Sequence, residues 1–420
     1  MQSPGPLGHD GGRMLLPVLL SFVMSATPTD VNATPTDVSA TPTDVRATPT
    51  DSAPPDVKPR KDKVVDGVAV PLLSFNSDFG VGYGVVGGMY IYGDGHEPYK
   101  HAIGAQVFLT SRGIRNHYLR YDGPRLLGPL RVEARLEYRR EFLSPFYGAG
   151  NRSAPEFNGN EDDPRYNYDR NSSGAWLRLR GHLLGDDHPL QAYAGYSWKY
   201  MKINPYEASM LEEVHPLGIE GGSSGQLLAG VLWDTRDNES DPATGGVEEL
   251  DVRFSSHATG SRYQYAGLTL SERRYFQLSS RFTFALRMMV DVLFGEVPFF
   301  EWASAGGVLF TEGVGGMSSV RGVDRNRFSG NIKAFSNSEL RFRAFDMRLL
   351  GQQMSLGAAA FLDLGRVWHP GTVDGAWYAW HPGVGAGLRV MRRAAVIRLD
   401  YALSTETHEH RIYMNYGHMF

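Results

Sequence analysis

Residues 315–325 read Gly315-Gly316-Met317-Ser318-Ser319-Val320-Arg321-Gly322-Val323-Asp324-Arg325, a glycine-rich stretch with Arg321 at its tip. The stretch lies between two segments, 280–295 and 330–345, in which apolar and polar residues alternate. Such alternation is typical of β-strands, whose successive side chains point to opposite faces of a sheet. The sequence therefore predicts a loop between two strands, folded back so that its arginine meets partners on the sheet.

Strand parity supplies two acidic partners. Leu340 lies on the apolar face of the segment 330–345, so its neighbour Glu339 points the other way. Leu362 does the same in the segment 353–364, which turns Asp363 to the polar face. A guanidinium can donate to two carboxylates in charge-assisted bonds, and Gly322 gives the tip conformational freedom. A single arginine or a single acid would be interpreted as a solvated charge. The glycine-rich loop tip, the strand parity of the two acids and the order of the segments together predict that Arg321 bonds both acids, an arrangement that we call the clamp.

Period-2 alternation continues from Val64 to Phe420 and predicts an all-β fold. The 49 Gly, 21 Tyr and 21 Phe favour strands and tight turns over helices. Many predicted strands reach the ~9–11 residues of a tilted transmembrane strand, whereas soluble strands usually have ~5–6. We predict sixteen antiparallel strands, at 65–75, 81–92, 100–111, 114–122, 130–141, 172–184, 190–202, 222–236, 246–258, 262–277, 280–295, 330–345, 353–364, 379–392, 394–404 and 410–420.

The connections between these strands differ in length on the two sides. If Val64 is periplasmic, the long connections 142–171, 203–221, 296–329 and 365–378 all fall on the outer side. Short turns fall on the other side, as expected of an outer-membrane barrel. We therefore predict a 16-stranded antiparallel transmembrane β-barrel over 64–420, in which the sixth extracellular loop, 296–329, folds inward.

The region before the barrel is predicted to be a leader and a spacer. Arg13 precedes an apolar run that ends in Ser25-Ala26, the form of a secretory signal peptide. We predict this signal peptide over 1–26, with Met14 as an alternative first residue. Residues 27–63 carry a TPTDV repeat of period seven, in which each proline interrupts a helix and one valine offers little to bury. They are predicted to form a disordered linker.

Composition excludes several kinds of site. The chain has no cysteine, a formal net charge of -4 and no basic run, so neither a thiolate metal site nor nucleic-acid binding is expected. No run of about 18 apolar residues predicts a membrane-spanning helix. We identify no nucleophile elbow and expect no enzymatic activity, no metal site and no cofactor. The cluster His408-Glu409-His410 is interpreted as a solvated loop.

Four ordered motifs resemble the barrel domain of the BamA/TamA family, in the outer-membrane-protein-85 superfamily. Val320-Arg321-Gly322 resembles the tip of its sixth loop, although Val323 replaces the usual aromatic residue. A turn into the ninth strand is similar to a family turn, and two strand segments are similar to its barrel wall. These three stretches are Asp234-Thr235-Arg236-Asp237-Asn238 with Asp241-Pro242-Ala243-Thr244-Gly245-Gly246, Ser338-Glu339-Leu340-Arg341-Phe342, and Phe361-Leu362-Asp363-Leu364-Gly365.

The resemblance covers about 64–420 and implies a function. It implies a barrel that assists insertion or translocation of proteins at the outer membrane, with outer-membrane lipids and unfolded outer-membrane proteins as partners. Family members carry polypeptide-transport-associated domains before the barrel, and the repetitive residues here could not form one. We therefore expect a short form, to which the resemblance does not carry over the periplasmic partners of those domains.

The predicted seam between the first and last strands is weak. Gly67 and Pro71 lie in the first strand and Gly417 in the last; glycine weakens a strand and proline removes a ladder donor. The last strand ends at Phe420, and its alternation would place His418 on the lipid face. A terminal aromatic residue resembles the insertion signal of outer-membrane proteins. An alternative interpretation puts Pro71 simply at a strand boundary.

Other classes of function remain as alternatives. The first is a passive outer-membrane channel or small-solute transporter with no assembly activity, favoured by a mobile loop and an open lumen. The second is an adhesive or structural role for the outer loop Phe142–Arg170, which is rich in Asn, Gly, Asp and Tyr.

Overall fold

The computed structural model describes residues 65–93, 99–185, 188–239, 241–306, 311–349, 352–373, 375–392 and 395–420. The predicted signal peptide and repeat linker lie outside these residues. None of the helices in the described part has the length and apolar character needed to span a membrane.

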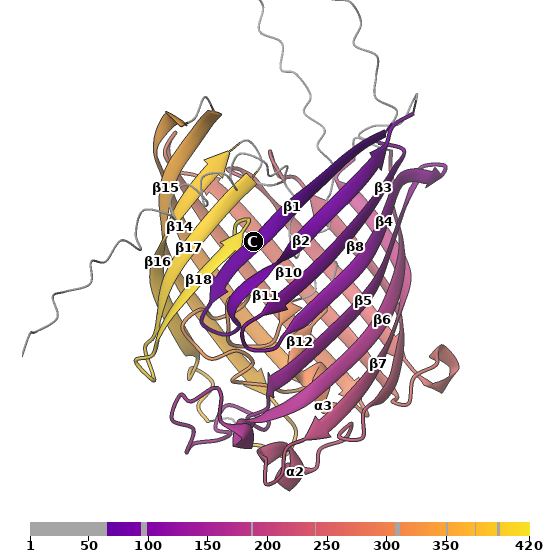
Figure 1. The fold of residues 1–420 in the computed structure, drawn as a ribbon, viewed down its shortest axis with the longest axis vertical. Helices are drawn as coiled ribbons and strands as arrows, with labels where there is room; N and C mark the ends of the chain where they lie inside the picture. The colour runs from indigo at the N-terminus through magenta and orange to yellow at the C-terminus, as the bar shows by residue number, and fades with distance from the viewer. Residues whose placement is uncertain are drawn as a thin grey trace, which may run out of the picture.

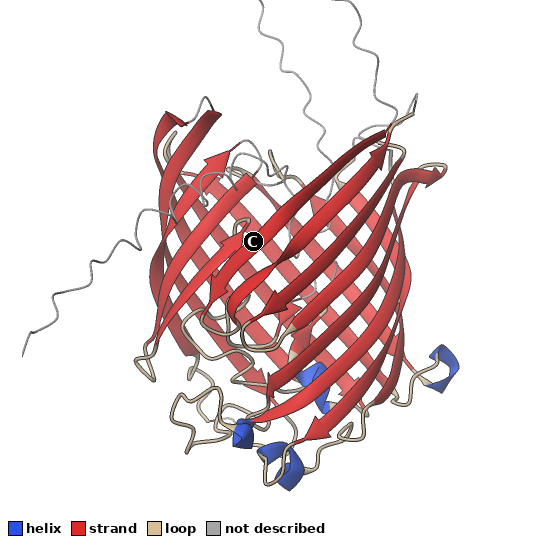
Figure 2. Cartoon of the chain, viewed as in Figure 1, coloured by secondary structure: helices blue, strands red, loops and turns tan. Residues whose placement is uncertain are grey.

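Within the described ranges, sixteen antiparallel strands form one closed barrel, which confirms the predicted fold class (Figures 1 and 2). Each strand pairs with its neighbour in the chain, except that β11 pairs with β14 and β1 closes the barrel against β18. The strands are β1 (Val65–Asn76), β2 (Gly80–Ile91), β3 (His101–Thr110), β4 (Arg115–Leu127), β5 (Leu130–Pro145), β6 (Asn167–His182), β7 (Leu190–Pro205), β8 (Gly222–Asp234), β9 (Gly245–Ser255), β10 (Tyr265–Gln277), β11 (Phe282–Gly295), β14 (Ile332–Leu349), β15 (Gln352–Trp368), β16 (His381–Arg392), β17 (Ala395–Ser404) and β18 (His410–Tyr416).

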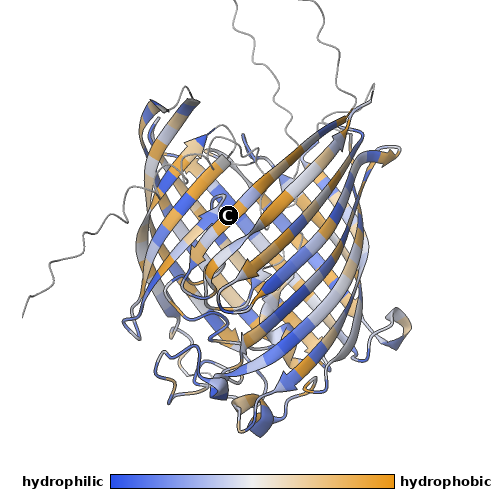
Figure 3. Cartoon of the chain, viewed as in Figure 1, coloured by the Kyte–Doolittle hydropathy of each residue, from blue (hydrophilic) through white to orange (hydrophobic). Residues whose placement is uncertain are grey.

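Apolar and polar residues alternate along many of the strands (Figure 3), and their burial assigns them to an apolar exterior and a polar lumen. On β11, Met288 and Val290 are exposed on the outside, whereas their neighbours Arg287 and Asp291 are buried inside. Asp291 pairs there with Lys333 of β14, 2.9 Å away. This is the inverse of a soluble barrel and suits a cylinder surrounded by lipid.

The long connections gather at one end of the barrel (Figure 2). They include the short elements η1 (Pro164–Tyr166), α2 (Met210–Val214), η2 (His257–Thr259) and α3 (Phe299–Trp302). An apolar cluster joins several of them, with Phe146, Leu211 and Phe299 among its buried members. The predicted outer loop 142–171 is shorter than expected, because β5 extends to Pro145 and β6 begins at Asn167.

The loop between β11 and β14 contains a small sheet of β12 (Ser304–Ala305) and β13 (Thr311–Glu312).

A short stretch at the start of β8 bears on the question of catalysis. Gly221-Gly222-Ser223-Ser224-Gly225 has the spacing Gly-x-Ser-x-Gly, which our expectation of no nucleophile elbow overlooked. Ser223 lies in β8 opposite Tyr200, however, and not on a strand-to-helix turn that would expose a nucleophile.

Candidate functional site

Glycines and one buried apolar residue allow the loop tip to lie inside the barrel. Gly315, Gly316 and Gly322 adopt positive φ angles of 112°, 96° and 93°, which favour glycine over other residues. Val320 is fully buried in a cluster with Val314, Phe328 and Val367. A side chain on Gly365 would lie 2.5 Å from Val320 Cγ2, so the wall glycine makes room for the tip.

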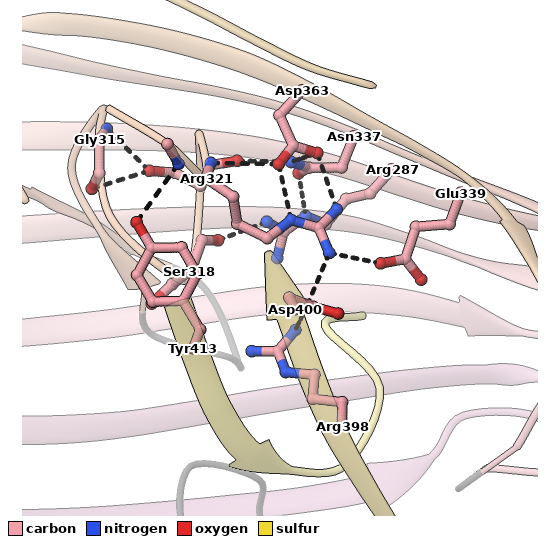
Figure 4. A network of polar contacts seen from close by, with 12 residues as sticks. Arg287, Gly315, Ser318, Arg321, Asn337, Glu339, Asp363, Arg398, Asp400 and Tyr413 are labelled. Carbon is pink, nitrogen blue, oxygen red and sulfur yellow. Dashed lines mark hydrogen bonds and ion pairs between the residues drawn. The ribbon is translucent and has the colours of Figure 1, made fainter. Parts of the chain in front are cut away.

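Arg321 is fully buried and contacts acids from three wall strands (Figure 4). Its Nε and Nη2 donate to the two carboxylate oxygens of Asp363 at 2.7 and 3.0 Å. Its Nη1 donates to Glu339 at 2.7 Å and to Asp400 at 3.1 Å. The predicted clamp residues Arg321, Glu339 and Asp363 therefore come together, with a bidentate bond to Asp363 of the kind that fixes a guanidinium plane.

Asp400 is a clamp residue that our sequence analysis missed. It lies on β17 between Leu399 and Tyr401, whose side chains are exposed on the barrel exterior. The parity argument that located Glu339 and Asp363 would have placed Asp400 in the lumen as well. Asp400 shows the same strand alternation as the two predicted acids, but it lies outside the family motifs that we identified.

Two of the three acids are shared with wall arginines. Arg341 Nε lies 3.0 Å from Glu339, and Arg389 Nη1 lies 2.5 Å from Asp400. Burial alone would lower the pKa of Arg321, but the nearby carboxylates of Asp363 and Glu339 outweigh it and raise that pKa above its ordinary value. Arg321 is therefore charged within the lumen. Loss of that charge would leave buried carboxylates without their partner, which is costly.

Polar contacts also hold the backbone of the tip. Arg321 N donates to Asp363 at 3.1 Å, and Gly322 N donates to the Tyr413 hydroxyl at 3.3 Å. Asn337 Nδ2 donates both to Ser319 O and, at 2.8 Å, to Asp363 Oδ1. The Arg321 guanidinium carbon lies 3.4 Å from the centre of the Phe361 ring. Side chain and main chain are thus fixed together, and the tip docks in one orientation.

The second predicted motif forms the periplasmic turn between β8 and β9. Arg236 Nη2 lies 2.6 Å from Asp234, and Asp237 Oδ1 accepts from the amides of Ala243 and Thr244 at 2.9 and 3.1 Å. Asn238 Oδ1 accepts from Asp241 N at 2.9 Å, Pro242 is buried, and Gly245 has a φ of 85°. The residues of this motif brace one turn and lie apart from the clamp.

The seam between β1 and β18 is short. Among the described residues, the ladder pairs only Phe75 with Met414 and Asn76 with Tyr413, whereas all twelve residues of β1 pair with β2. Figure 1 shows β1 continuing past the end of β18. Gly67 and Pro71 therefore belong to the part of β1 that has no ladder partner on β18, and the alternative that Pro71 marks a strand boundary is wrong.

The C-terminal tail corrects two expectations. We expected a strand to Phe420 with His418 facing lipid, but β18 ends at Tyr416 and Gly417 turns the chain with a φ of 78°. His418 Nε2 instead lies 2.9 Å from Asp241 of the β8–β9 turn. Turning inward gives the imidazole a polar partner that lipid could not offer.

Phe420 also lies inside the barrel. Its carbonyl oxygen accepts from Arg341 Nη2 at 3.0 Å, and its ring lies 5.3 Å from the guanidinium carbons of both Arg287 and Arg341. The tail thus crosses from the seam to β11 and β14. While it is docked there, it cannot extend the ladder between β18 and β1.

At the outer end of the seam, Arg411 of β18 links several connections. It pairs with Asp324 of the inward loop and Glu161 of the β5–β6 connection, and its Nη1 lies 3.5 Å from Asp78 of the β1–β2 turn. Arg411 Nη2 also lies 3.1 Å from Glu409. Glu409, which we expected to be solvated, therefore takes part in closing the outer end of the seam.

Together, the apolar exterior, the closed ladder and the clamped loop define an outer-membrane β-barrel. The Omp85 superfamily domain matches residues 112–420, which is well over half of the chain. The chain therefore belongs to the Omp85 superfamily and is a protein of the bacterial outer membrane. No curated protein sequence matches it.

Solved structures share the fold. The chain is similar to BamA from Haemophilus ducreyi lacking POTRA domains 1-3, with a TM-score of 0.59 and 14% identity over 84% of this chain and 70% of that chain. It is also similar to CdiB from Escherichia coli (TM-score 0.59, 14% identity, 85% of this chain, 63% of that chain) and from Acinetobacter baumannii (0.52, 16%, 84% and 60%). The chain thus spans less than two thirds of either CdiB.

Replacing Arg321 is expected to destabilise the barrel strongly. Arg321→Ala leaves buried carboxylates without their cation and should cost about 3–5 kcal/mol of unfolding free energy. Arg321→Lys keeps the charge without the bidentate geometry and should fall between Arg321→Ala and the native chain. The measurement is urea unfolding in detergent micelles, followed by loss of the compact, heat-resistant band in gel electrophoresis.

Arg165→Ala is the matched control, because Arg165 pairs with Glu213 at 3.1 Å on the outer surface. Exposed pairs contribute little, so this variant should change stability by less than about 1 kcal/mol. Equal losses in Arg321→Ala and Arg165→Ala would contradict the clamp.

Docking of the C-terminal tail is expected to depend on pH. Burial and the charge of Arg341 lower the pKa of His418 to about 4, although its bond to Asp241 opposes the shift. A histidine with a lowered folded-state pKa binds protons more readily when released, so docking is fully stabilised above about pH 6.5 and weakens as the pH falls toward 4. Hydrogen exchange of residues 417–420, corrected for intrinsic rates, should accelerate over this interval.

His418→Gln, which keeps a side-chain donor but does not titrate, is the control and should exchange at a pH-independent corrected rate. The same acceleration in His418→Gln would show that another group governs the tail.

Proposed function

We propose that this barrel assists the insertion or translocation of proteins at the outer membrane, through the seam between β1 and β18. The observation that carries the proposal is the shortness of the seam: ten of the twelve residues of β1, Val65–Ser74, have a ladder partner on β2 and none on β18 among the described residues. An unpaired strand edge is a template for another strand. The implied clients are unfolded outer-membrane proteins.

The free edge of β1 suits β-augmentation. An incoming strand gains main-chain hydrogen bonds from such an edge whatever its side chains are, which permits many clients. The docked tail keeps β18 from occupying the same edge, since Phe420 at its end contacts Arg287 of β11 and Arg341 of β14. A client would therefore compete with little existing ladder.

The clamp gives the rest of the barrel the rigidity that such a seam requires. Arg321 joins β14, β15 and β17 through Glu339, Asp363 and Asp400. These three wall strands are thus tied to the loop and to each other, and none of them is β1 or β18, so that the seam could open without loosening this part of the wall. The proposed activity uses binding and strand exchange, and we propose that it involves no catalysed reaction.

A disulfide across the seam should abolish this activity. The chain has no cysteine, so Phe75→Cys with Met414→Cys would form one defined cross-link at a paired position. In liposomes that contain the native protein, an unfolded outer-membrane barrel should fold faster than in empty liposomes. The oxidised variant should lose this acceleration and regain it on reduction.

Leu270→Cys with Val290→Cys is the control, since it cross-links a fully paired stretch of β10 and β11. It should keep the acceleration in both redox states. Equal client folding with and without the native protein would end the proposal, and ion conductance that persists in the locked seam would favour a passive channel instead.

A further inference from the structure

The barrel exterior carries positive charge on one arc of its outer end. Arg115 begins β4 and shares strand parity with Leu119, whose side chain is exposed on the outside. Arg140 of β5 shares parity with the exposed Leu136, and its cross-strand partner is Arg115. The two arginines therefore lie side by side on the surface that faces the membrane, at the outer ends of their strands.

This pairing is unfavourable unless an anion accompanies it. Like charges directly opposite each other on one sheet face repel. Arg140 has a partner, Asp169 of β6, at 3.2 Å, but Arg115 forms no ion pair with any residue in the described part of the chain. Both guanidinium groups lie near the Phe142 ring, at 4.2 Å for Arg140 and 5.8 Å for Arg115. The acid beside these two adjacent arginines thus pairs with Arg140 and leaves Arg115 without an ion pair among the described residues.

A groove lies beside these arginines. It has a volume of about 530 Å³ and runs over β2, β3 and β4 at their outer ends. Its apolar lining includes Val107, which is 54% exposed, and Leu109, and its polar end includes Arg115 and His117. His117 is stacked on Tyr138, and its Nδ1 is buried without a hydrogen-bond partner among the described residues.

The groove has the two chemistries of an anionic lipid. Its apolar side faces the bilayer, where an acyl chain can lie, and its charged end is at headgroup height because Arg115 directly follows the outer turn 111–114. Guanidinium groups bind phosphate with charge-assisted hydrogen bonds. A soluble anion would satisfy Arg115 but would leave the apolar side of the groove unused.

We propose that this groove, the β3–β4 groove, binds one anionic, phosphorylated lipid of the outer leaflet. The phosphate contacts Arg115, with Arg140 and His117 beside it, and an acyl chain lies along Val107 and Leu109. The site lies on β2, β3 and β4 and includes no residue of the seam strands β1 and β18, and it does not depend on the proposed insertion activity.

Native mass spectrometry of the full chain in detergent tests the site. The probe is a diphosphorylated, acylated glucosamine disaccharide, titrated against the native protein and Arg115→Gln. Removal of one charged partner should weaken binding by about tenfold or more. Phosphatidylcholine, which lacks net charge, should bind equally weakly to both proteins.

Lys202→Gln is the matched control: Lys202 is an exposed cation near the outer end of β7, away from the groove lining. It should change lipid affinity by less than about twofold, since it lies outside the contact shell. Equal losses in Lys202→Gln and Arg115→Gln would reduce the effect to general surface charge and overturn the site.

Two further probes distinguish lipid from free anion. The deacylated, phosphorylated disaccharide should bind far more weakly than the acylated form, and inorganic phosphate should not displace the lipid. Equal binding of the deacylated form, or displacement by inorganic phosphate, would contradict the proposal. A heat-resistant band in Arg115→Gln confirms that the variant is folded.

Discussion

A guanidinium with no access to water, bonded to carboxylates from three strands, is the interaction on which the rest of this structure depends. Ion pairs at a protein surface contribute little, but a buried charge without its partner is costly. Because Arg321 and its acids are all fully buried, the removal of any one of them leaves a buried charge without that partner. The loop is thereby committed to the lumen, and its apolar residues, such as Val320, pack there in turn.

The barrel combines this rigid contact with a weak one. Strands β14, β15 and β17 are joined through Arg321. The next strand after β17 in the barrel is β18, and the ladder between β18 and β1 contains few pairs. Polar links compensate at both ends of β18: Arg411 joins the outer connections, and His418 joins the periplasmic turn. Side-chain contacts therefore supplement the short ladder at the seam, while the wall of β14, β15 and β17 is held by the buried clamp. This distribution suits a barrel that opens at one place.

Much of this could be predicted from the sequence, because strand parity is a strict rule. The strand number, the inward loop and the meeting of Arg321 with Glu339 and Asp363 all follow from alternation and order. Asp400 obeys the same rule, but it lies outside the family motifs on which our prediction of the clamp was based. Parity failed at His418 and Phe420 for a physical reason: Gly417 takes a left-handed conformation, and alternation has no meaning beyond it. The partners of Arg411 come from connections distant in sequence, so no local pattern could announce them.

The central claim is that Arg321 and Asp363 act as one unit inside the barrel. A double-mutant cycle measures this directly, with unfolding free energies of the native chain, Arg321→Gln, Asp363→Asn and the double variant. The account predicts a coupling energy of about 2–3 kcal/mol, at the upper end for residues in contact, so that the second substitution costs little once the first is made. Additivity within about 0.5 kcal/mol would contradict it, since independent sites add in that way.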